Sequence, residues 1–97
     1  MKKELIAAIF KLHGCKSVWK ESVPVKEIFQ GQTVWDGIVE VFDLIDHPTD
    51  KRCYAWSHLV DKSGKRKFFA VLHQGPVDSP EKAVRAAIVS IYRDGST

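Results

Sequence analysis

The side chains with nucleophilic or metal-binding chemistry include two cysteines and four histidines, and their spacing decides what chemistry is open to them. In the segment YAWSH, Ser57 directly precedes His58, which suggests a nucleophile beside its base. Neighbouring residues of a β-strand point to opposite faces, so Ser57 and His58 are a poor pair despite their adjacency. Nothing local, such as a helix N-terminus, marks Cys53 as an activated thiolate. The sequence therefore predicts no nucleophilic site.

The same residue types could hold a metal ion, but their spacing does not favour it. Only His13 and Cys15 form a close pair, and no segment matches a zinc finger or a His-Glu-x-x-His site. His47 lies in a loop rich in Asp and Pro, where a turn stabilised by side-chain hydrogen bonds is favoured over acid–base catalysis. We expect no catalytic residue, no metal and no cofactor. A small metal-dependent or hydrolytic enzyme built near His47 or Cys53 is a distant alternative.

The elements that position these residues follow from hydrophobic periodicity and turn residues. Apolar residues at helical spacing predict a helix over residues 2–13, and Ser79 as N-cap before Pro80 predicts a second helix over residues 80–93. β-branched and aromatic runs predict strands at about residues 23–29, 33–44, 52–60 and 66–73. Pro24 lacks the N–H that a central strand donates, so we expect the first of these strands at a sheet edge.

This order of elements predicts a single α+β domain over residues 1–97. We expect a helix, an antiparallel meander of three or four strands, and a second helix, with both helices packed on one face of the sheet. A chain of 97 residues with 44% hydrophobic content can bury one core. Two distant cysteines are too few for a disulfide framework, and the apolar run near the N-terminus is too short to span a membrane. We therefore expect a cytoplasmic protein without membrane association.

The last two strands predict a hairpin whose two faces differ in side-chain size. A connecting loop of two or four residues would place Tyr54 and Trp56 on the face of Phe69. Cys53 and Ala55 fall on the other face, where we expect the helices because small side chains allow a close approach. The opposite face, which we call the aromatic–basic face, would carry Arg52, Tyr54, Trp56, His58, Lys65, Lys67, Phe69 and His73. This face is the predicted partner-binding surface.

Aromatic rings surrounded by positive charge need either a cover or a partner. A second copy of the chain, the segment around Trp19 or a long loop could cover them, and a foreign protein could bind them, because interfaces favour Trp, Tyr and Arg at their centres. Unpaired bases could also stack on the rings while Lys and Arg contact phosphates. The net charge of +3 is small for a dedicated nucleic-acid binder. We expect a non-catalytic module that acts by protein–protein interaction or self-association, with RNA or single-stranded DNA as the alternative partner.

Three segments, VWDGIVEVFDLIDHP, KRCYAWSH and PVDSPEKAVRAAI, resemble a group of small bacterial proteins usually described as hypothetical or uncharacterised. The resemblance covers about residues 23–93. It implies a bacterial cytoplasmic origin, with a mobile element as one setting, where small accessory proteins often bind a host protein. It implies no activity, cofactor or catalytic residue.

The order of a helix, three strands and a helix also resembles the double-stranded RNA-binding domain. That domain begins its last helix with a lysine-rich motif that contacts phosphate. Here Lys82 and Arg85 remain, but Pro80 and Glu81 stand where basic residues would be expected. The extra strand before the meander is a second departure. The likeness is therefore one of element order and carries no function by itself.

Overall fold

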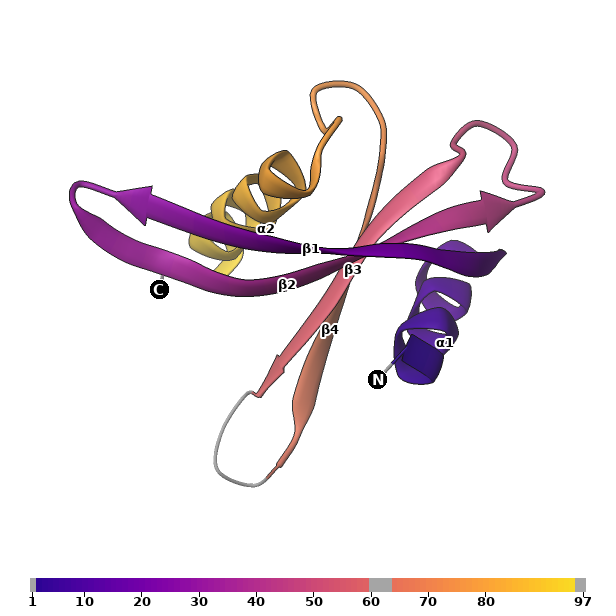
Figure 1. Ribbon diagram of the computed structural model, residues 1–97, viewed down its shortest axis with the longest axis horizontal. Coiled ribbons are helices and arrows are strands. Elements are labelled where there is room, and N and C mark those ends of the chain that lie inside the picture. The colour runs from indigo at the N-terminus through magenta and orange to yellow at the C-terminus, as the bar shows by residue number, and fades with distance from the viewer. Residues whose placement is uncertain (1, 60–63, 96–97) are drawn as a thin grey trace.

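The computed structural model describes residues 2–59 and 64–95. Its elements are helix α1 (Lys2–His13), strands β1 (Lys16–Phe29), β2 (Gln32–Ile45), β3 (Arg52–Leu59) and β4 (Arg66–Leu72), and helix α2 (Pro80–Gly95) (Figure 1). The four strands form one antiparallel sheet in the order β1-β2-β3-β4. The predicted α+β class, the element order and the antiparallel meander are confirmed.

Strand β1 is longer than the sequence predicted. It begins at Lys16 rather than near Val23, so the segment around Trp19 is part of the sheet and pairs with β2. β1 is an edge strand, which confirms the position expected for Pro24. Its residues alternate little in polarity because most of them are exposed, and this hid the first half of the strand from the sequence pattern.

The sheet divides into two diverging hairpins. The β1–β2 ladder extends along both strands to the Phe29–Gln32 pair, and the β3–β4 ladder reaches Leu59. By contrast, β2 pairs with β3 only between residues 40–43 and residues 52–55, among the residues that the structure describes. Figure 1 shows the two hairpins crossing and separating, as expected for strongly twisted two-stranded ribbons. We call residues 23–39 the β1–β2 arm and residues 56–69 the β3–β4 arm.

The two helices cover opposite faces of the sheet. Leu5 of α1 belongs to a buried cluster with Cys53, whereas Val84 of α2 belongs to a buried cluster with Tyr54 and Trp56. Cys53 and Tyr54 are neighbours on β3 and point to opposite faces. In Figure 1, α1 and α2 lie on either side of the β3–β4 pair. The expectation that both helices pack on one face was therefore wrong: both faces of β3 are apolar, and each is covered by one amphipathic helix.

The predicted division of the last two strands into a face of large side chains and a face of small side chains is confirmed. Trp56 lies opposite Phe69, and Ala55 lies opposite Ala70, so the large and small side chains separate as expected. The face with small side chains does receive a helix, namely α1, whose buried cluster includes Ala55. The error concerned α2, which packs on the large aromatic side chains instead.

Candidate functional site

The centre of the aromatic–basic face is buried beneath α2. Tyr54 and Trp56 are 2% and 3% exposed. The Trp56 ring stacks on Phe69 at a centroid distance of 5.3 Å and meets Trp35 edge to face at 5.9 Å. These contacts, together with the helix above them, make Tyr54 and Trp56 core residues. The structure thus corrects the expectation that these two rings face outward.

Two other predicted residues of this face have partners within the chain. His73 Nδ1 is hydrogen bonded to the Tyr54 hydroxyl at 2.6 Å. Burial is the main cause that raises the pKa of Tyr54 above its ordinary value. The Arg52 guanidinium lies 3.5 Å from the Asp43 carboxylate on the neighbouring strand. These contacts give Arg52, Tyr54 and His73 structural roles.

The remaining predicted residues lie along the β3–β4 arm. His58, Lys65 and Lys67 are exposed, and Phe69 is half-buried. The His58 ring stacks on Phe69 at 5.3 Å, and the Lys67 ammonium lies 5.4 Å from the centroid of the same ring. The basic rim is therefore on the surface, as expected, while most of the aromatic centre is not.

A hollow of about 340 Å³ lies between the two arms and beside α2. Its lining comes from β2 (Trp35, Asp36), β3 (Trp56, His58), β4 (Phe69) and α2 (Val84, Ala87, Ile88). We call this hollow the arm cleft. Gly37 helps to shape it, because a Cβ at that position would lie 3.1 Å from Cη2 of the Trp35 ring, which folds over the glycine. The volume is at the lower end of the range of roughly 300–1,000 Å³ for ligand pockets.

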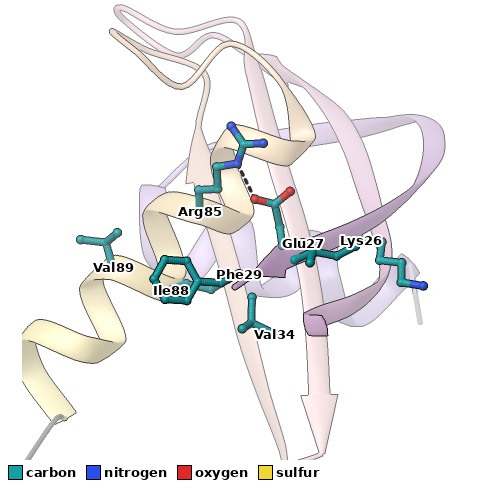
Figure 2. Close-up of a pocket in the computed structure, with 8 residues that line it drawn as sticks. Lys26, Glu27, Phe29, Val34, Arg85, Ile88 and Val89 are labelled. Atoms are coloured by element: carbon teal, nitrogen blue, oxygen red, sulfur yellow. Dashed lines mark hydrogen bonds and ion pairs between the residues drawn. The ribbon is translucent and has the colours of Figure 1, made fainter. Parts of the chain in front are cut away.

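A second, larger hollow of about 680 Å³ opens between the tip of the β1–β2 arm and α2 (Figure 2). We call its apolar residues the tip patch: Ile28, Phe29, Val34, Ile88 and Val89. Ile28 and Phe29 are 63% and 65% exposed, and Val34 and Val89 are also exposed. Ile88 lines both hollows, so the tip patch and the arm cleft adjoin each other at α2.

Three charged residues, Lys26, Glu27 and Arg85, line the hollow beside the tip patch, and two of them pair with each other. Arg85 of α2 forms an ion pair with Glu27 of β1, and this bridge ties the helix to the arm (Figure 2). The hydrogen bond and the charge of Glu27 raise the pKa of Arg85. The patch therefore offers a partner mainly apolar surface.

The sequence analysis missed the tip patch. Ile28 and Phe29 were assigned to the edge strand over residues 23–29, and no surface role was predicted for them. The signal was their position directly before the Gln30–Gly31 turn. Side chains next to a hairpin turn lie at the far end of the sheet, and α2 leaves Ile28 and Phe29 largely exposed there.

The residues considered as nucleophiles, acid–base groups or metal ligands are either buried or engaged in structural hydrogen bonds. Burial, with a smaller contribution from Cys15, raises the pKa of the Cys53 thiol to about 12, which makes it a poor nucleophile. His47 Nδ1 accepts hydrogen bonds from the backbone N–H groups of Thr49 at 3.2 Å and Asp50 at 2.9 Å, which confirms its predicted role in a turn. Within residues 2–59 and 64–95, no three His, Cys, Asp or Glu side chains gather closely enough to hold a metal ion.

No family model, curated protein or solved structure matches the chain. In the part of the chain that the structure describes, no helix is long and apolar enough to cross a membrane. The functional conclusion therefore depends on the surfaces described above.

Proposed function

We propose that the protein is a non-catalytic binding module, that its partner is another protein, and that the tip patch is its contact surface. The exposure of Ile28 and Phe29 beside an apolar hollow carries this proposal. Single exposed apolar residues are common, but a contiguous apolar patch next to a hollow marks an interaction site. The proposed setting is the bacterial cytoplasm, which rests on the sequence resemblance alone.

The chemistry of this surface favours protein over nucleic acid. Single-stranded nucleic acid binds by stacking its bases on exposed rings, and both Tyr54 and Trp56 are buried. The tip patch is apolar, and the guanidinium of Arg85 at its rim is already paired with Glu27. A nucleic-acid partner would bind with an affinity that falls steeply with salt concentration, whereas an apolar contact depends little on salt.

Two exposed phenylalanines on different surfaces allow a matched test. Phe29 is 65% exposed in the tip patch, and Phe10 is 56% exposed on α1. The tagged wild type, Phe29→Lys and Phe10→Lys are used to capture proteins from a bacterial lysate, and each captured protein is then purified and titrated against all three. We expect Phe29→Lys to weaken binding by about tenfold or more and Phe10→Lys to change it by less than about twofold.

Three outcomes would contradict the proposal. The first is the absence of any captured protein that binds after purification. The second is a partner that binds Phe29→Lys as tightly as it binds the wild type. The third is an affinity for single-stranded DNA or RNA that is tight, falls steeply with salt and is insensitive to Phe29→Lys. Light scattering on the wild type completes the test, because a dimer lost in Phe29→Lys would make the partner a second copy of the chain.

A further inference from the structure

Within residues 2–59 and 64–95, no strand pairs with part of the inner edge of β2, the edge that faces β3. The N–H of Leu44 donates to the carbonyl of Lys51 at 2.8 Å, on the side of β2 that faces β3. Backbone groups alternate between the two sides of an antiparallel strand, so even-numbered residues of β2 direct their N–H and C=O toward β3. The β2–β3 ladder ends at Glu40. Asp36 and Ile38 therefore direct their backbone groups into the space between the arms, where no described strand pairs with them.

The two outer edges of the sheet, by contrast, are protected. Pro24 lies opposite Ile38 in the β1–β2 ladder, so its backbone nitrogen faces outward and cannot donate to an added strand. On β4, the carbonyl of Ala70 accepts a hydrogen bond of 2.7 Å from His13 Nε2, which occupies that edge. The β2 segment over residues 32–39 contains neither Pro nor Lys, the residues that commonly block strand addition.

Apolar side chains lie on both faces of this inner edge. On the α2 face, Trp35 and Ile88 line the arm cleft. On the opposite face, Ile38 is 50% exposed. Side chains of an extended strand alternate between the two faces of a sheet, so a strand added here would find apolar contacts for both sets.

From these observations we infer that the inner edge of β2 binds an extended peptide segment of the partner as an added β-strand, paired with Asp36 and Ile38. This inference rests on the proposed function and names the form in which the partner binds. The arm cleft beside this edge has a volume of about 340 Å³ and is bounded on the other side by Trp56 and His58, so it suits a short extended segment better than a folded second copy. The partner is thus an exposed or unfolded peptide segment rather than a rigid surface.

The charges beside the arm cleft indicate the composition of the bound peptide. The Lys67 ammonium of β4 lies 5.4 Å from the centroid of the Phe69 ring, which lines the arm cleft, and the β2 side of the cleft contributes the carboxylate of Asp36. An added strand that alternates apolar residues and carries acidic residues near one end would complement both the apolar faces and the Lys67 ammonium. The bound peptide is therefore expected to be apolar and acidic.

The test uses a displayed library of random nine-residue peptides, selected against the wild-type protein and then synthesised. Ile38→Pro removes the N–H that faces the cleft, whereas Ile38→Val keeps that N–H and a similar side chain. Ile38 does not hydrogen bond to β1 through this N–H, so the β1–β2 ladder is retained. We expect selected peptides to bind Ile38→Pro at least about tenfold more weakly than the wild type, and Ile38→Val within about twofold.

Hydrogen exchange on the wild type gives a second measurement that needs no variant. The selected peptide should slow exchange of the Asp36 and Ile38 amides. Peptides that depend on Phe29 but leave these amides unprotected would overturn strand addition and keep the proposed function. An absence of peptide binders together with a purified partner that depends on Phe29 would also overturn it. Protection of both amides in the free protein at high concentration, with dimer formation, would assign the edge to a second copy and overturn the inference.

Discussion

Replacement of Trp56 by alanine tests whether α2 covers the aromatic face. Trp56 is 3% exposed and packs between Phe69 and Trp35 in the cluster that includes Val84 of α2. Removal of a buried Trp or Phe side chain costs about 3–5 kcal/mol, because apolar burial is lost and a cavity remains. A domain of this kind is stable by about 5–15 kcal/mol, so the variant should lose a large part of its free energy of unfolding.

Trp19→Ala is the matched control within the same chain. Trp19 is 38% exposed, donates a hydrogen bond of 2.8 Å from Nε1 to Glu40, and has the Lys2 ammonium 3.7 Å from its ring centroid. Loss of these surface contacts should cost about 1–2 kcal/mol. Urea denaturation followed by far-ultraviolet circular dichroism measures both variants without dependence on tryptophan fluorescence. Equal losses in the two variants, or a loss below about 1.5 kcal/mol for Trp56→Ala, would refute the placement of α2 over Trp56.

Three further predictions concern buried or turn residues. The pKa of Cys53 is raised from 9.0 to about 12, so between these pH values the folded state keeps a proton that the unfolded state releases. The free energy of unfolding should therefore fall between about pH 9 and 12, by an amount on the order of 4 kcal/mol. Urea denaturation at pH 8 and pH 10.5 should show about half of this loss, on the order of 2 kcal/mol, in the wild type and a smaller loss in Cys53→Ala; equal losses would contradict the assignment. Tyr54→Phe removes the hydroxyl bonded to His73 and should lower the free energy of unfolding by about 1 kcal/mol, with no change in the circular dichroism spectrum; an unchanged stability would show that the bond contributes nothing. His47→Ala removes the acceptor for two backbone amides and should cost about 1–2 kcal/mol, whereas His47→Asn keeps a turn-forming acceptor and should cost less; the reverse order of melting temperatures would contradict this role.

Local patterns were sufficient to predict most of the elements. Both helices were predicted, α1 from the apolar spacing before Gly14 and α2 from its start at Ser79 and Pro80. This was possible because helix ends are determined by residues close in the sequence. Alternation also predicted that Trp56 shares a face with Phe69, since a shift by one residue would exchange the two faces. The first half of β1 was missed because its exposed residues do not alternate in polarity.

The placement of α2 and the shape of the site depend on contacts between distant segments. Small side chains such as Ala55 correctly indicated a close helix, but they did not show that Trp56 would also be covered. The arm cleft exists because β2 and β3 separate beyond the Glu40–Ala55 pair. That point depends on the twist of the whole sheet, which no local pattern of residues encodes. The sequence therefore indicated the aromatic residues without indicating which of them are exposed.

Residue-resolved hydrogen exchange of the free protein at low concentration tests the central claim most directly, namely that Asp36 and Ile38 of β2 pair with no described strand on the side that faces β3. The amides of Gly37 and Val39 face β1, and that of Glu40 faces β3 within the ladder, so all three should exchange slowly. The amides of Asp36 and Ile38 face the space between the arms and should exchange much faster. Protection of Asp36 and Ile38 equal to that of Gly37 and Val39 would show that the edge is already paired, and would contradict the account.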